Sequence, residues 1–303
     1  MSVDRELQGR FSAEFRHAEA VYLRARLLQL LSGLIAAVGV GLSAAAPSYA
    51  LFSGVTLSAA QIVYALTLLA VLCSLASAWC GHRSKSQRAV AEEARRSYML
   101  CYGLGWPMSQ LRRADLLAEF RSTPEEGRKL EADDYFASSL PAGASRLREI
   151  SQENIFWTRW LCEESARATW AWFALALCVL TGLLLLVPLL PTGVDAVRYC
   201  YIISIGLAML ITSDLQGRAR AYNKAATALK VIDRDLERIR WNPDLDADTL
   251  HLFLDYNSIA EVTPTVPTQV YLKMRSKLNQ LWAQRCKAID QSPNDMPAAP
   301  PPA

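Results

Sequence analysis

The sequence predicts an all-α integral membrane protein in which four transmembrane helices form two hairpins and carry helical cytosolic extensions. Its 303 residues are 52% hydrophobic and 20% charged, but the charges are segregated rather than interspersed. Four stretches contain no Asp, Glu, Lys or Arg: 27–52, 57–81, 168–194 and 199–213. Three of them exceed the roughly 20 residues that a helix needs to cross a hydrocarbon core. The fourth stretch is shorter, but residues 196–213 are long enough to cross the membrane if the Arg198 guanidinium reaches back to the membrane surface.

The distribution of positive charge around these stretches predicts their orientation. Residues 47–58, between the first two spans, carry no charge, and the segment between the last two spans holds only Asp195 and Arg198. The other flanks are rich in Arg and Lys, and cytoplasmic loops are the ones that carry such an excess. Both termini and the central segment of this multi-pass chain are therefore expected in the cytoplasm.

This orientation divides the chain into six segments. We expect a cytosolic amphipathic helix, a first transmembrane hairpin, a cytosolic helical insert, a second transmembrane hairpin, cytosolic C-terminal helices and a disordered tail. Their boundaries, in that order, are 1–26, 27–81, 82–169, 170–213, 214–290 and 291–303. The tail is expected to be disordered because five of its thirteen residues are proline.

Apolar periodicity and helix-breaking residues predict the helices of the polar segments. An apolar stripe at spacings of three and four runs from Leu7 to Ala25, and no Pro or Gly separates it from the first span. Further helices are predicted over 109–120, from 145 into the third span, over 249–259 and after Pro267. Three continuous helices are expected to join polar segments to spans: 5–46, 59–102 and 197–240.

The first span carries a ridge of small residues at four-residue spacing: Gly33, Ala37, Gly41 and Ala45. Such a ridge lets another helix backbone approach closely inside a membrane. It serves packing within one subunit or between the subunits of a homo-oligomer, and the sequence leaves both open.

A second packing surface follows the last span. Apolar residues there alternate at spacings of three and four over nearly three heptads, as in a coiled coil. They are Tyr222, Ala225, Leu229, Ile232, Leu236 and Ile239. This heptad seam requires a partner: the N-terminal stripe, another cytosolic helix or the same helix of a neighbouring subunit.

The chain offers little for catalysis, metal binding or ion transport. Its three histidines, His17, His82 and His251, are scattered, its seven cysteines form no CxxC pair, and no nucleotide-binding or hydrolase motif occurs. No span has an ionisable residue at mid-bilayer, where ion-coupled transporters place one. We therefore expect no catalytic residue, no metal and no cofactor. The net charge of +3 gives no reason to expect a DNA or RNA duplex as partner.

The cytosolic segments do contain aromatic and arginine residues that are close in sequence: Tyr135, Phe136, Arg146, Arg148, Trp157 and Arg159. Aromatic faces stack on bases and guanidinium forks bind phosphates, so a small anionic nucleotide is a chemically reasonable ligand for them. The alternative, which composition alone favours, is an aromatic-packed helical collar with solvated arginines.

Three short motifs and the order of the segments resemble a known family. The motifs are Asp134-Tyr135-Phe136, then Gln152, Asn154 and Trp157 before the third span, then Pro264-Thr265-Val266-Pro267 followed by Tyr271 and Arg275. With its two hairpins, cytosolic insert and C-terminal helices, the chain resembles the SMODS-associated four-transmembrane pore-forming effectors, relatives of the SLATT proteins, or a sister family of them. The likeness spans nearly the whole chain and is mainly one of organisation.

The resemblance implies a role in bacterial anti-phage defence. Such effectors are thought to work beside a cyclic-oligonucleotide synthase, to sense its product or another infection cue, and to permeabilise the inner membrane. The chain is accordingly expected to be a homo-oligomer in the lipid bilayer of the bacterial inner membrane, with a cyclic oligonucleotide as its ligand. The alternative is a non-enzymatic membrane scaffold whose cytosolic helices recruit a protein partner through the heptad seam.

Overall fold

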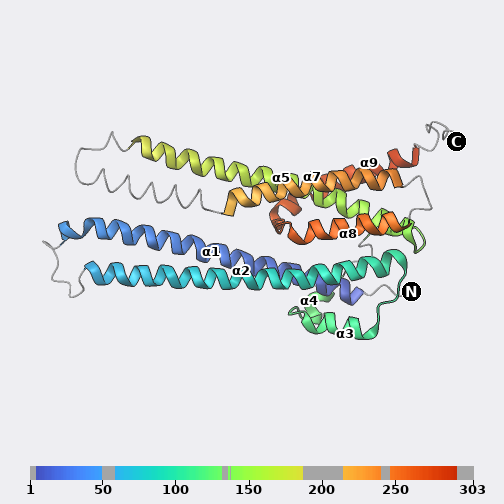
Figure 1. Cartoon of the computed structure of the whole chain (residues 1–303), viewed down its shortest axis with the longest axis horizontal. Helices are drawn as coiled ribbons and strands as arrows, with labels where there is room; N and C mark the ends of the chain where they lie inside the picture. Colours follow the sequence, from blue (N-terminus) through green and yellow to red (C-terminus); the bar gives the residue numbers. More distant parts are fainter. Residues whose placement is uncertain are drawn as a thin grey trace. The chain divides into compact units, whose positions relative to one another are not determined.

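The computed structural model describes residues 5–49, 59–131, 136, 138–186, 214–239 and 246–291. These residues form eight α-helices and no strand (Figure 1), so the all-α prediction is confirmed for them. The helices are α1 (Arg5–Tyr49), α2 (Ala59–Leu104), α3 (Gln110–Glu119), α4 (Pro124–Arg128), α5 (Ala144–Leu186), α7 (Asp214–Ile239), α8 (Asp246–Val262) and α9 (Thr268–Gln291).

The chain divides into two compact units. The first comprises Met1–Tyr135 and Arg167–Arg220, and the second comprises Phe136–Ala166 and Ala221–Ala303. The long helix α5 therefore begins in the second unit and ends in the first, whereas α7 begins in the first unit and ends in the second.

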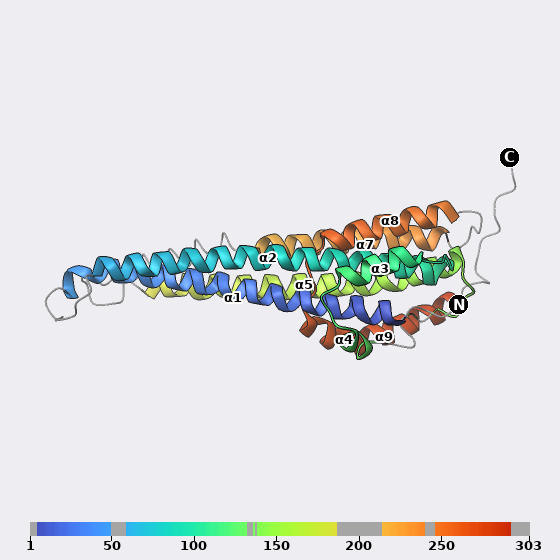
Figure 2. The ribbon, with the colours of Figure 1, turned by 90° about the horizontal axis from the view of Figure 1, so that it is seen from below.

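In the first unit, α1 and α2 form a long antiparallel hairpin whose helices lie side by side in both views (Figures 1 and 2). Each helix joins a charged, polar half to an uncharged, apolar half without interruption, as the sequence predicts for residues 5–46 and 59–102. The apolar half of the hairpin comprises residues 27–49 and 59–81. At the other end, α2 stops before Gly105, whose φ of 74° suits glycine and whose N–H donates to the Cys101 carbonyl.

A seam of small residues, one every seven positions, holds α1 against α2. We call it the seven-residue seam; its pairs are Ala18 with Ser84, Ala25 with Ser77, and Ser32 with Ala70. In each pair the serine hydroxyl donates to the carbonyl oxygen of the residue opposite, at distances of 2.6, 2.7 and 2.8 Å respectively. Seven residues make two helical turns, so small side chains recur on one face and the two backbones can approach closely.

The connection after α2 contains two short helices with well-defined N-termini. Helix α3 begins after Ser109, whose hydroxyl accepts the N–H of Arg112, and ends at Phe120, which confirms the helix predicted over 109–120. Helix α4 begins after Thr123, and Thr123 and Glu126 form a complete capping box. The sequence analysis did not predict α4.

Helix α4 packs closely on the polar half of α1. Gly9 of α1 faces Gly127 of α4 so closely that a Cβ atom on Gly9 would lie 2.3 Å from the Gly127 carbonyl oxygen. The carboxylate of buried Glu14 accepts the backbone N–H groups of Arg121 and Ser122, both at 3.0 Å. These contacts fix the segment between α3 and α4 against α1.

In the second unit, α5 packs against both α7 and α9. One buried cluster joins Phe156 and Leu161 of α5 to three residues of α9, namely Met274, Leu278 and Trp282. A smaller cluster joins Cys162 and Ala166 of α5 to residues of α7, namely Tyr222, Ala225 and Ala226. The helices predicted from 145, over 249–259 and after Pro267 are all present, as α5, α8 and α9.

Two helices are long and apolar enough to cross a membrane. They are Arg5–Gly39 of α1 and Gln61–Leu104 of α2, whose most apolar windows have mean hydropathies of 1.4 and 2.1 and are only 11% and 6% buried. The sequence predicts four spans, but the third is described only as far as Leu186 and the fourth, 199–213, lies outside the described residues. The helix expected over 197–240 is described from Asp214 onwards, and the tail at 291–303 only at Gln291.

Candidate functional site

The second unit contains a buried ion-pair cluster where α5, α7 and α9 meet. We call it the junction, and its charged members are Arg159, Glu163, Asp233, Glu237 and Arg285. Asp233 is only 5% exposed, and Arg285 donates to its two carboxylate oxygens at 2.9 and 2.8 Å. Arg285 also pairs with Glu237, while Arg159 lies 3.2 Å from Glu163 and 3.8 Å from Asp233. Side chains of three helices therefore share one set of charges.

Aromatic rings and electrostatics keep Arg285 charged at this position. Its guanidinium carbon lies 5.7 Å from the ring centre of Phe156 and 5.9 Å from that of Trp282. Burial lowers the pKa of Arg285, but the carboxylates of Asp233 and Glu237 outweigh burial and hold this pKa above its usual value. The junction is thus a set of fixed charges that holds α5, α7 and α9 together.

The sequence-predicted ligand-sensing residues lie along the first part of the second unit. Phe136 is buried, with 6% of its surface exposed, and Tyr135 lies outside the described residues. The ring of Trp157 lies 6.0 Å from that of Tyr271 on α9. Arg146 and Arg148 are half-buried on the first turns of α5, and Arg159 belongs to the junction.

These residues do not converge on one point. Arg146 and Arg159 stand on one helix, and at 1.5 Å per residue their Cα atoms are roughly 20 Å apart. Arg159 faces the carboxylates of Glu163 and Asp233, so an anion bound there would have to replace a carboxylate. The nucleotide-binding role of the set remains a prediction.

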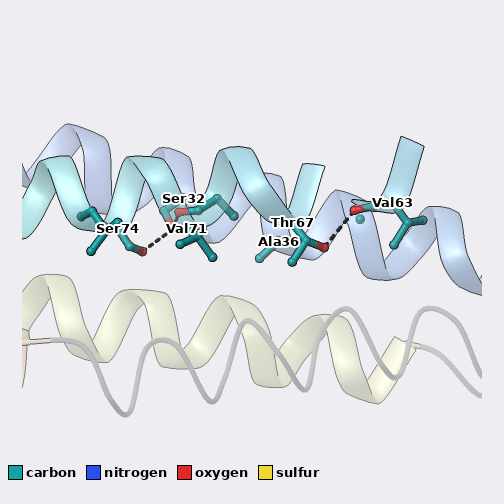
Figure 3. Close-up of a pocket in the computed structure, with 9 residues that line it drawn as sticks. Ser32, Ala36, Val63, Thr67, Val71 and Ser74 are labelled. Atoms are coloured by element: carbon teal, nitrogen blue, oxygen red, sulfur yellow. Dashed lines mark hydrogen bonds between the residues drawn. The ribbon is translucent and has the colours of Figure 1, made fainter. Parts of the chain in front are cut away.

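The apolar half of the α1/α2 hairpin contains a groove of about 530 Å³ with three hydroxyl groups in its lining (Figure 3). The Ser32 hydroxyl donates to the Ala70 carbonyl, so the Ser74 hydroxyl is the donor in the 2.7 Å bond between the two serines. Thr67 donates to the Val63 carbonyl of its own helix at 2.8 Å. All three hydroxyl protons have acceptors, which suits an environment without water.

The predicted packing residues have different surroundings. Gly33 of the small-residue ridge is buried and Ala37 is half-buried, whereas the structure does not describe the burial of Gly41 and Ala45. Five members of the heptad seam are buried within the chain: Tyr222, Ala225, Leu229, Ile232 and Leu236. Ile239 is half-buried, and Tyr222 packs on Cys162 and Ala166 of α5. The seam thus contacts another helix of the same chain.

The sequence analysis did not identify Asp233 and Arg285. The two residues are 52 positions apart, and no local pattern marks an ion pair between two helices at that separation. One sequence signal could have indicated that Asp233 is buried: it directly follows Ile232 of the heptad seam, which packs against another helix. Among the described residues, no group of three or more His, Cys, Asp or Glu side chains is placed to hold a metal ion.

Comparison with known proteins gives no further guide to the function of these features. The chain matches no protein-family model, no curated protein and no solved structure.

Proposed function

We propose that the protein is a regulated membrane effector that oligomerises and permeabilises the bacterial inner membrane in response to a cytosolic signal. In this proposal four helices span the membrane, both termini lie in the cytoplasm, and the signal is a cyclic oligonucleotide produced during phage infection. The lipid bilayer and further copies of the chain are its partners. The resemblance stated above supports the defence role and the type of signal.

One structural observation carries the proposal. Helices α1 and α2 each run unbroken from a polar half that packs against α3 and α4 into an apolar half with exposed leucines, such as Leu30 and Leu75. A helix transmits a rotation or shift along its axis because its backbone hydrogen bonds are continuous. A rearrangement of the polar half would therefore reach the apolar half directly.

The junction can supply a large part of the free energy that such a switch requires. Converting a 1:99 population of states into 99:1 takes about 5.5 kcal/mol of differential binding. Breaking one partner of a buried ion pair costs about 3–5 kcal/mol, and the pair of Asp233 and Arg285 is of this kind. A signal that rearranges the junction would thus supply most of this free energy, and its other contacts would supply the remainder.

Dye release from liposomes tests the proposal. The purified full chain is reconstituted in liposomes loaded with a self-quenching dye, and cyclic di- and trinucleotides are added one at a time. We expect release with at least one of them, and a shifted half-maximal concentration for Arg285→Gln. Arg275→Gln, an exposed arginine on the same helix, is the matched control and should behave as the wild type.

A second arm measures uptake of a membrane-impermeant dye by phage-infected cells that express the chain, so that a signal other than a nucleotide is also detected. No release in liposomes together with no uptake in infected cells would refute the proposal. A stable complex with a cytosolic protein would then support the scaffold alternative. That alternative requires the heptad seam to open first, because Leu229 and Leu236 are fully buried within the chain.

A further inference from the structure

A second cavity in the first unit has a different character from the groove in the apolar half. It has a volume of about 730 Å³ and lies between α1 and α2 where their polar and apolar halves meet, beside the segment that precedes α4. This is within the range of about 300–1,000 Å³ that is usual for sites of small ligands. We call it the arginine cleft, after Arg24, Arg83 and Arg121 in its lining.

The three guanidinium groups of the arginine cleft have no carboxylate partner within 4.0 Å among the residues that the structure describes. Some arginines elsewhere are paired with carboxylates, for example Arg112 with Glu93 and Arg159 with Glu163. Arg83 instead lies over the ring of Trp79, with 5.2 Å between its guanidinium carbon and the ring centre. Three like charges around one cavity repel one another, and an anion between them would remove that repulsion.

The acidic groups near the arginine cleft are already engaged. The carboxylate of Glu126 contacts His17, which also lines the cleft, at 3.3 Å, and it closes the capping box of α4. Glu14 is buried, and its carboxylate accepts the backbone N–H of Arg121. This hydrogen bond fixes the backbone at Arg121, whose side chain stays exposed. The formal charge of the lining is therefore clearly positive.

A buried polar side chain in the lining of the same cavity has an unsatisfied oxygen, and exchanging the oxygen and nitrogen of its amide would turn it into a donor. Gln87 lines the arginine cleft, is only 6% exposed, and its side-chain oxygen has no hydrogen-bond partner among the described residues. Leaving a buried amide unsatisfied is unfavourable, and such groups normally have a partner. A primary amide turned about its last torsion presents two N–H donors, which suit the oxygens of an anion.

The arginine cleft also lies at a defined level of the hairpin. The uncharged stretch of α2 ends at residue 81, between Trp79 and Arg83, and the last arginine before the uncharged stretch of α1 is Arg26. Tryptophan and arginine side chains are typical of the membrane–water interface, where phospholipid phosphates lie. The cavity would thus open at the level of the headgroups if the hairpin crosses a membrane.

We propose that the arginine cleft binds a phosphate group through Arg24, Arg83, Arg121 and Gln87. Phosphate is the anion that guanidinium forks bind best, and donors around it come from α1, α2 and the segment before α4. The headgroup of an anionic phospholipid and a soluble nucleotide both present this group. In either case the ligand would contact α1, α2 and the segment before α4 at the same time.

Titrations of the full chain in detergent test this proposal and distinguish the two sources of phosphate. The probes are sodium pyrophosphate, dihexanoyl phosphatidylglycerol and, as the zwitterionic control, dihexanoyl phosphatidylcholine; calorimetry gives the dissociation constants. We expect binding of pyrophosphate, of phosphatidylglycerol or of both. Saturation by pyrophosphate indicates a soluble ligand, whereas binding of phosphatidylglycerol alone indicates a lipid, and each outcome supports the site.

Variants then show whether the arginine cleft is the place of binding. Loss of one charge-assisted contact should weaken binding by about tenfold or more, so the double variant Arg24→Gln/Arg83→Gln should reduce it below detection. If that variant fails to fold, Arg121→Gln serves instead, because its side chain is exposed and its backbone contact with Glu14 is kept. Arg16→Gln, an exposed arginine of α1 outside the lining, is the matched control.

Two results would overturn the proposal: no binding of either anionic probe by the wild type, or binding that Arg121→Gln and the double variant leave unchanged. Membrane permeabilisation is not needed for any of these measurements. Failure of the dye-release experiment and failure of this proposal can therefore be told apart.

Discussion

Replacing Gly9 by alanine should loosen the packing of α4 on α1. A Cβ atom at residue 9 would lie 2.3 Å from the Gly127 carbonyl oxygen and 2.8 Å from its carbonyl carbon. Ordinary contact begins near 3.4 Å, so α4 would have to move away by about 1 Å. Because the obstacle is backbone, no side-chain rotation relieves the overlap.

The surroundings limit how far α4 can move. The Arg10 side chain donates to Ser122 and to the Leu117 carbonyl, both at 3.3 Å, and its guanidinium carbon lies 5.4 Å from the ring centre of Phe120. These contacts hold the chain just before α4 to the same turn of α1 that carries Gly9. Overpacking of this kind costs about 1–3 kcal/mol, while alanine in place of glycine inside a helix gains about 0.5–1 kcal/mol. The net destabilisation should be about 1–2 kcal/mol.

Thermal unfolding in detergent, followed by far-ultraviolet circular dichroism, measures this effect. In a protein of this size, 1 kcal/mol corresponds to about 2–4 °C, so the midpoint should fall by several degrees. Gly81→Ala is the matched control: Gly81 also lies within a long helix, but no atom lies within 4 Å of its added Cβ. That variant should melt at or slightly above the wild-type temperature. A Gly9→Ala protein that melts no lower than the Gly81→Ala protein would show that the two glycines do not hold α4 in close contact.

Three other predictions follow from the charges and the packing. Arg285→Gln should destabilise the second unit by about 3 kcal/mol, because Asp233 stays buried with a weaker partner. Urea unfolding measures this loss of stability, and the control Arg275→Gln should not show it. Ser84→Leu should lower the free energy of unfolding by about 2 kcal/mol, because a leucine would force α1 and α2 apart at the seven-residue seam. Ser86→Leu, on the exposed face of α2, should leave the melting temperature unchanged. The Thr123 backbone N–H, with smaller help from the Thr123 hydroxyl and His17, lowers the pKa of Glu126 below 4.5. The capping carboxylate therefore stabilises α4 above pH 4.5, and this stabilisation is lost as the pH falls through the lowered pKa. The backbone amides of α4 should exchange their hydrogens faster below that pKa. The Glu126→Gln protein, which has no carboxylate to protonate, should show no such change with pH.

Local sequence signals predicted the helix boundaries well where capping residues are present. Ser109 before α3 and Gly105 after α2 are such residues, and both boundaries lie within two residues of the expected positions. The omission of α4 was avoidable, because Thr123 and Glu126 at three-residue separation, with Pro124 between them, form the pattern of a capping box.

The seven-residue seam was not predicted from the sequence, and the ridge of small residues at four-residue spacing stays a prediction. That ridge comprises Gly33, Ala37, Gly41 and Ala45, whereas the hydrogen-bonded contacts between α1 and α2 recur every seven positions, at Ala18, Ala25 and Ser32. A seven-residue pattern is visible in α1 alone, but its meaning depends on a matching pattern in α2. The pairing register between two helices depends on contacts that are distant in sequence, which local periodicity does not contain.

The seven-residue seam also bears on how a signal would pass along the hairpin. Its hydrogen bonds occur in the polar half, at Ser84 with Ala18, and in the apolar half, at Ser32 with Ala70. Each hydroxyl has a single proton, and carbonyl oxygens on that face recur about once per turn, so sliding positions between two registers lose these bonds. The hairpin therefore favours discrete registers over gradual sliding, and packed interfaces of this kind switch between alternatives. Arg83 of the arginine cleft directly precedes Ser84 in α2, so a phosphate bound there would act on the register at a position already coupled, through the seam, to the apolar half.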